Sequence, residues 1–483
     1  MANQPPKRRD LTQGPIGPTL LLFALPTLGS SVLQSLNGSI NAVWVGRFLG
    51  ENALAATSNA NMIMFLLNAF VFGFGMAATI LVGQSFGRGD IDSARRAIGT
   101  ALGAFIPVTI VTAALGWIFA PQILTLLHTP AEAYQPALDY LRVIFAAIPM
   151  SLIIVLMMMG LRGSGDSITP LYFMAVSVVL DSTLNPVFIL GLGPAPRWGI
   201  AGSAFATVIA NLVALIAMIA YIYARDLPLR LRGHELAYLK PDGATLRTIM
   251  VKGFPMGLQM IVVSVAALVM IGLVNAEGLN TAAAFGVAQQ LWTYVQMPAM
   301  AIGAAVSAMA AQNIGAQKWD RVSQITRSGI IQNVFLTGAL VALLLAFDRP
   351  ALALFLGGHS PALPIARHIQ VVATWNFVLF GITMVLFGVV RANGSVVAPL
   401  VILAIALFPA RLGFIAVAQP LIGTDALWLS FPVGSIITVL GAVWFYKYGG
   451  WRKNRMMVPV AQEECIEEAL GTSEPGGRLN PAA

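Results

Sequence analysis

Long apolar stretches alternate along the chain with short polar segments that contain glycine, proline and charged residues. Each stretch reaches roughly 20 residues, which is the length that an α-helix needs to cross the hydrocarbon core of a bilayer. A segment in lipid must satisfy its own backbone polar groups, so every stretch is expected to be helical. The pattern predicts an all-α integral membrane protein with about twelve transmembrane helices, at residues 17–44, 54–82, 97–120, 136–161, 168–192, 199–223, 250–275, 281–311, 325–347, 366–390, 396–419 and 425–446.

Composition excludes a water-soluble globular protein. Of the 483 residues, 57% are hydrophobic and 10% are charged, whereas soluble domains carry roughly 25% charged residues. The first apolar stretch contains Pro26 and lacks a small-x-small cleavage site, so we expect a retained helix rather than a signal peptide. The single cysteine, Cys465, lies in a polar tail, and no intramolecular disulfide is expected.

The basic residues gather in the two terminal segments and in the loops after the even-numbered predicted helices. These are Lys7, Arg8 and Arg9; Arg88, Arg95 and Arg96; the group from Arg225 to Lys252; Lys318, Arg321 and Arg327; and the group from Lys447 to Arg455. Loops rich in Lys and Arg stay on the cytoplasmic side. The pattern therefore predicts a multi-pass protein of the inner (plasma) membrane with both termini in the cytoplasm.

The chain also repeats itself at a nearly constant spacing. The paired elements are GQSFG at 83–87 with AQNIG at 311–315, Arg162–Gly165 with Arg391–Gly394, and Pro26 with Pro255. Their common order indicates a duplication, and because both halves begin on the same side, the repeats are parallel and related by a pseudo-twofold axis along the membrane normal. We expect a cytoplasmic segment at 1–15, a six-helix bundle at 16–223, a cytoplasmic linker at 224–249, a second bundle at 250–446, and a cytoplasmic tail at 447–483 that is expected to be disordered.

The sequence resembles the multidrug and toxic compound extrusion (MATE) family, most nearly its branch similar to DNA-damage-inducible protein F. The resemblance rests on Val45-Gly46, the GQSFG and AQNIG segments, the RGSGD and RANG turns, the segment Leu184–Ile189 and Pro298, and covers roughly residues 15–450. It implies export of organic cations and other amphipathic compounds by alternating access, driven by a proton or sodium gradient.

Asp181 is the acidic residue that falls well inside a predicted span. An ionisable side chain in a membrane is costly and usually functional, and low dielectric favours the neutral carboxyl over the carboxylate. Asn185 follows on the same helical face, and Pro186 cannot donate to the carbonyl of Ser182. Together these groups predict a proton or small-cation site, with a structural Asp bonded to a neighbouring helix as the alternative.

The chain departs from the family in two respects. The branch named above has an aspartate on helix 1, where this chain has Asn41, and its helix 5 pair runs Asn then Asp, the reverse of Asp181 and Asn185. We expect Asp181, Asn185 and Asn41 to form the coupling site. Pro26 is expected to kink helix 1, a bend that the resemblance links to occupancy of the site, with an ordinary structural kink as the alternative.

Polar, thioether and aromatic side chains of the predicted spans suit a cavity for lipophilic cations, although such residues also mediate helix packing. The candidate lining residues are Gln34, Asn37, Asn68, Met256, Gln259, Met260, Gln289, Trp292, Met297 and Arg411. Arg411 is the other embedded charge, and snorkelling to the interface is its alternative reading.

The predicted function is secondary efflux of small amphipathic compounds, coupled to influx of a proton or of sodium. A lipid-linked oligosaccharide flippase and a narrow metabolite exporter of the same superfamily are the alternatives. The chain lacks the Lys-Ser/Thr of a phosphate-binding loop, and we expect no enzymatic activity, cofactor, metal or nucleic-acid partner. We expect a monomer in the bilayer.

Overall fold

The computed structural model describes residues 10–126, 129, 131–192, 198–454 and 456, with the side chains of 51–68 and 131–133 outside that description. Most of the two predicted terminal segments, at 1–9 and 457–483, therefore lies outside the described residues. The first half of the chain forms α1 (Ile16–Leu49), α2 (Glu51–Arg88), α3 (Ile91–Leu126), α4 (Ala131–Gly163), α5 (Ile168–Leu190) and α6 (Gly199–Ala224).

A short 3₁₀ helix at Gly233–Leu239 lies in the linker between the halves. The second half forms α7 (Gly243–Ala276), α8 (Leu279–Gly315), α9 (Trp319–Ala346), α10 (Asp348–Leu356), α11 (Ala362–Ala373), α12 (Asn376–Ala392), α13 (Val397–Ile405), a π-helix at Ala406–Ala410, α14 (Arg411–Ile422) and α15 (Asp425–Tyr448), followed by a 3₁₀ turn at Trp451–Lys453. Eleven helices within the described residues are long and apolar enough to cross a membrane, and α11 with α12 adds a twelfth if the pair is one span. The predicted fold class is confirmed.

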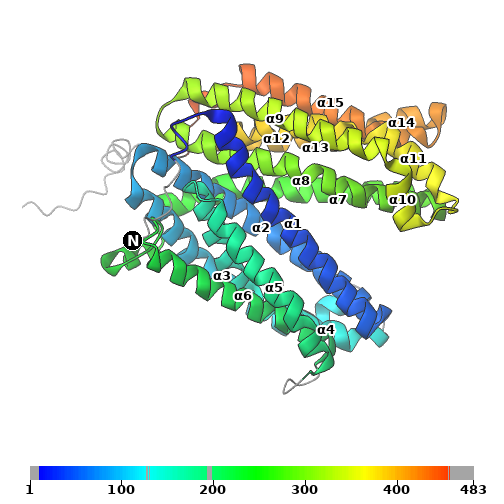
Figure 1. The fold of residues 1–483 in the computed structure, drawn as a ribbon, viewed down its shortest axis with the longest axis horizontal. Coiled ribbons are helices and arrows are strands. Elements are labelled where there is room, and N and C mark those ends of the chain that lie inside the picture. The colour runs from blue at the N-terminus through cyan, green and yellow to red at the C-terminus, as the bar shows by residue number, and fades with distance from the viewer. Residues whose placement is uncertain (1–9, 127–128, 130, 193–197, 455, 457–483) are drawn as a thin grey trace, which may run out of the picture.

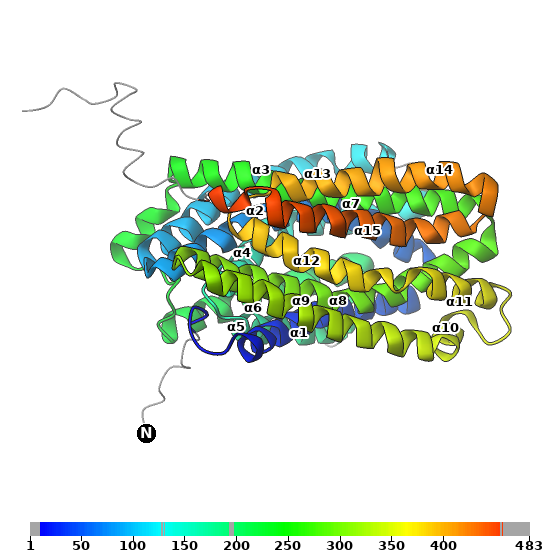
Figure 2. The same ribbon diagram turned by 90° about the horizontal axis from the view of Figure 1, so that it is seen from above.

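Two six-span bundles make up the molecule, with α1 to α6 in one and α7 to α15 in the other (Figure 1). The helices run along the long axis, and the described chain ends lie at the same end as the linker between α6 and α7 (Figures 1 and 2). We call this end the basic end, because it carries Arg88, Arg95, Lys318, Arg321 and Arg452. The opposite end, toward which the two bundles diverge in Figure 1, is called the far end.

Three local features of the second half differ from the prediction of twelve uninterrupted transmembrane helices. The tenth predicted span is two helices, α11 and α12, bent by 44° where they meet. Before it, the short helix α10 occupies a segment expected to be a loop, and Asp348 at its start bonds to Arg367 of α11 at 2.8 Å. In the eleventh span, the π-helix around Pro409 interrupts the α-helical bonds, since proline offers no backbone N–H.

Candidate functional site

Asp181 lies at the meeting point of three helices of the first half. It is 1% exposed on α5. Its Oδ2 accepts a hydrogen bond from Nδ2 of Asn41 on α1 at 2.9 Å. Its Oδ1 accepts from Nδ2 of Asn185 at 3.1 Å and from Oγ1 of Thr207 on α6 at 2.9 Å. Asn185 also donates to Oδ1 of Asn41 at 2.9 Å, so the three predicted coupling residues form one connected group.

Some hydrogen-bond acceptors near Asp181 have no donor among the described residues. The side chain of Asn37, one turn before Asn41, also faces the carboxyl group of Asp181. The amide oxygens Oδ1 of Asn37 and of Asn185 are buried and have no hydrogen-bond partner among the described residues. A buried acceptor without a donor costs about 1–3 kcal/mol. Both oxygens belong to side chains that interact with Asp181, so the group has hydrogen-bond acceptors that no described residue uses.

The local sequence explains why α6 can reach this carboxyl. A methyl group at Gly202 would lie 2.5 Å from the carbonyl oxygen of Phe188, so only glycine permits this approach of α6 to α5. Ala206 and Ala210 are fully buried on the same helix, as expected where small residues let two membrane helices pack closely. Thr207 then comes within hydrogen-bond distance of Asp181.

Sequence reasoning missed Thr207. A signal was present, because Thr207 and Asn211 are polar residues one helical turn apart in an otherwise apolar span. The structure pairs both with α5, since Oγ of Ser177 donates to Oδ1 of Asn211 at 2.8 Å. This second polar pair lies one turn from Asp181 toward the basic end.

Arg411 is a buried charged residue on a candidate membrane span of the second half. It is 6% exposed at the start of α14. Its guanidinium carbon lies 3.7 Å from the ring centroid of Phe431, and Nε donates to Oγ of Ser430 at 3.2 Å. Its Nη2 is buried without a partner among the described residues. Trp292 also packs on Phe431, with centroids 5.1 Å apart, so two predicted cavity residues share one aromatic cluster.

The other predicted residues lie apart from the Asp181 group. Trp292 donates to Gln370 and Thr374 inside the second half, and Nε2 of Gln259 donates to the carbonyl of Val396 at 3.1 Å. Met256 is buried in the main hydrophobic cluster. Pro26 lies within α1, which is continuous across it. The remaining candidates are Gln34, which is exposed, and Met260, Gln289 and Met297, which are half-buried. The side chain of Asn68 lies outside the described residues.

The two halves meet at the basic end through a pair of equivalent contacts. Nε2 of Gln84 donates to the carbonyl of Ala392 at 2.7 Å, and Nε2 of Gln312 donates to the carbonyl of Gly163 at 3.0 Å. Each bond crosses from one half to the other. Glycines make the approach possible, since a methyl group at Gly87 would lie 1.9 Å from the carbonyl oxygen of Gln312. These residues come from the repeated motifs, which therefore form the seam between the halves.

Comparisons with known proteins agree with this architecture. The MatE family model matches residues 26–187 and 255–417, one match in each half. The probable multidrug resistance protein YoeA of Bacillus subtilis is 35% identical over 440 residues, covering 91% of this chain and 95% of that protein. The FAD transporter of Shewanella oneidensis is 24% identical over 439 residues, covering 91% and 96%.

A crystal structure described as MATE in complex with MaD3S shares the fold, with a TM-score of 0.84 at 19% identity, over 93% of this chain and 100% of that one. The duplicated bundle with embedded charges defines a multi-pass membrane transporter. The chain belongs to the MatE family, the multidrug and toxic compound extrusion transporters.

Proposed function

We propose that the protein exports amphipathic organic compounds, organic cations above all, by alternating access, and that a proton bound at Asp181 drives the export. The observation that carries this proposal is the buried carboxyl of Asp181, set among three side-chain donors and next to two unpartnered amide oxygens. The three donors stabilise the carboxylate, whereas burial and the free acceptors favour the protonated acid. A group balanced between two protonation states is what a proton-coupled cycle requires.

The basic end faces the cytoplasm in this proposal, because basic loops are retained there. The present state is closed at the basic end by the bonds of Gln84 and Gln312, so Asp181 takes its proton from the far, external side. Opening of the basic end then releases the proton inward. The Ser177–Asn211 pair lies on the side of Asp181 toward which this proton leaves.

A specific observation favours a second candidate, export of an anionic or zwitterionic metabolite. Arg411 is buried with an unpartnered Nη2 in the second half, and a relative of similar length is named an FAD transporter. A lipid-linked oligosaccharide flippase would need several cationic groups to hold a pyrophosphate, and a single buried arginine supports it less.

The experiment is uptake of a fluorescent lipophilic cation into everted vesicles under an imposed pH gradient, with sodium absent and then present. Wild type is compared with Asp181→Asn, which keeps the shape of the side chain and removes its titration. Asp139→Asn is the matched control, because Asp139 is exposed and bonds to Gln135 of its own helix.

Gradient-driven uptake that is lost in Asp181→Asn and kept in Asp139→Asn supports the proposal. Uptake that survives in Asp181→Asn removes the coupling assignment. Uptake that appears only with a sodium gradient assigns the oxygen cluster to sodium, and uptake of an anionic probe alone supports the second candidate.

A further inference from the structure

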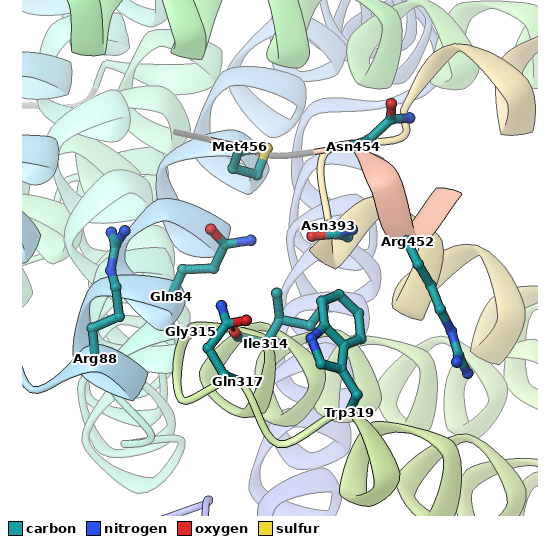
Figure 3. A pocket seen from close by; sticks show the side chains of 10 residues that line it. All are labelled: Gln84, Arg88, Ile314, Gly315, Gln317, Trp319, Asn393, Arg452, Asn454 and Met456. Carbon is teal, nitrogen blue, oxygen red and sulfur yellow. Dashed lines mark hydrogen bonds between the residues drawn. The ribbon is translucent and has the colours of Figure 1, made fainter. Parts of the chain in front are cut away.

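The basic end contains a cavity of about 640 Å³ between the two halves. Gln84 and Arg88 of α2 form one wall, and Asn393, Asn454 and Met456 lie across from them (Figure 3). The lining residues, in full, are Gln84, Arg88, Ile314, Gly315, Gln317, Trp319, Asn393, Arg452, Asn454 and Met456. The cavity is thus built from both repeats, directly over the seam that Gln84 helps to close.

The charge of this cavity has one sign. None of its ten lining residues is acidic, and two are arginines. Arg88 comes from the first half and Arg452 from the second, and Figure 3 shows them on opposite flanks. Lys252 adds a third positive charge nearby, because its Nζ donates to the carbonyl of Gly394, next to the lining residue Asn393, at 2.9 Å. An occupant with several negative charges fits this surface.

The chain itself leads to the mouth of the cavity. Trp451 is 1% exposed, stacks on Tyr446 at 5.4 Å, and accepts a bond at its carbonyl from Nδ2 of Asn393 at 2.9 Å. Asn454 donates to Ser395 at 2.6 Å. Met456 is 3% exposed and lines the cavity. The chain after α15 is therefore held beside the cavity at Trp451 and along the cavity wall at Asn454 and Met456.

The sequence that follows has the complementary charge. Glu463, Glu464, Glu467 and Glu468 lie within six positions of one another, and the first basic residue after Met456 is Arg478. Residues 457–462 separate this acidic segment from the wall, a reach of about 3.5 Å per residue at full extension. A ligand tethered so closely acts at an effective concentration on the order of millimolar.

We propose that this cavity is a docking site for the chain's own acidic segment, residues 463–468. The carboxylates interact with Arg88 on one half and Arg452 on the other, so the docked segment bridges the two repeats at the basic end.

Cys465 lies inside the segment and is the single cysteine, which allows a direct test. Gln317→Cys places a second thiol on the exposed rim of the cavity. In the full-length protein in nanodiscs of neutral lipid, a short bis-maleimide should join Cys465 to this thiol. Changing all four glutamates of the segment to glutamine should reduce the cross-linking rate by roughly tenfold or more, given the loss of tethered docking. Glu474→Gln, in the same tail but outside the segment, should leave it unchanged.

A charge reversal separates docking from simple proximity. Arg88→Glu should reduce cross-linking, and changing the four glutamates to lysine in the same protein should restore it. Equal cross-linking with the glutamine tail, or no restoration by the reversal, overturns the proposal.

Lipid headgroups are the other possible source of negative charge. In a Cys465→Ser background, the thiol of Gln317→Cys should be protected from maleimide by the acidic tail in neutral nanodiscs. Protection that depends on phosphatidylglycerol and not on the glutamates assigns the cavity to lipid and overturns the proposal. Neither readout requires transport, so the result is independent of the substrate and of the coupling ion.

Discussion

The bonds of Gln84 and Gln312 across the seam give a prediction about the balance between the closed and open basic end. Both side chains are buried, at 6% and 4% exposed. Replacing each by methionine keeps its length and removes its donor, which leaves the carbonyls of Ala392 and Gly163 unpaired in the closed state. In the open state, water would bond to both carbonyls. The substitutions therefore raise the free energy of the closed state alone.

The magnitude follows from the cost of one unpaired buried acceptor, about 1–3 kcal/mol. At about 1.4 kcal/mol per tenfold change, each single substitution shifts the equilibrium toward the open state by about 5- to 150-fold. The two bonds act on the same equilibrium, so the double variant should show roughly the product of the two shifts. The folded bundle itself should persist, because no core volume is removed.

Thiol accessibility at the seam measures this equilibrium. Ser85 is fully buried beside Gln84, and Ser85→Cys in a Cys465→Ser background introduces a thiol of similar size. Its labelling by a membrane-impermeant maleimide should accelerate in each glutamine variant and most in the double variant.

Asn333→Ala is the matched control for this assay. Asn333 donates to the carbonyls of Ala299 and Gly381, both within the second half. Its substitution therefore removes no hydrogen bond between the two halves. Unchanged labelling in the glutamine variants, or equal acceleration in Asn333→Ala, would refute the assignment of these bonds as the closing contacts.

Three further predictions concern single side chains. Thr207→Val removes a donor worth about 1.5–3 kcal/mol from the carboxyl that we propose carries the proton, so gradient-driven transport should fall at least tenfold. Thr183→Val should change transport little, because the Thr183 hydroxyl bonds, among the described residues, to carbonyls of its own helix. Burial acts to raise the pKa of Asp242, but hydrogen bonds from Thr245 outweigh it and lower the pKa below its ordinary value. Asp242→Ala should therefore cost about 1 kcal/mol of folding stability above pH 4, because the N-cap of α7 is lost. Thermal unfolding should show this difference disappear as the pH falls further. Arg411→Met removes a buried charge without a counter-ion, so thermal stability should hold or rise while transport of an anionic substrate is lost.

The spans could be predicted because the bilayer fixes both their length and their composition. α5 and α6 begin at the predicted residues, 168 and 199. Two irregular features could not be predicted from the sequence: the bend between α11 and α12, and the π-helix before Arg411. Both depend on how neighbouring helices accommodate a proline or a short polar break. The helix α10 was not predicted because its nine residues are too few to cross a bilayer, and it lies between two predicted spans.

The candidate ion site likewise contains residues that could be predicted from the sequence and one that could not. Asp181 and Asn185 could be paired from sequence, since four residues on one helix share a face. Asn41 was assigned to the site through the family resemblance, because it occupies the helix 1 position at which the related branch has an aspartate. Thr207 could not be assigned from its own helix, because its contact depends on the side that α6 turns to α5, which Gly202 determines through close packing.

Each half carries a buried charged residue near the end of its MatE match, and the two charges have opposite sign. The matches end at residues 187 and 417, which are six positions after Asp181 and six after Arg411. The contacts that close the seam are kept in both halves, whereas the buried charge is inverted. Symmetry is thus retained in the bonds between the halves and lost at the two buried charges, which supports separate ligands for Asp181 and Arg411 in the function proposed above.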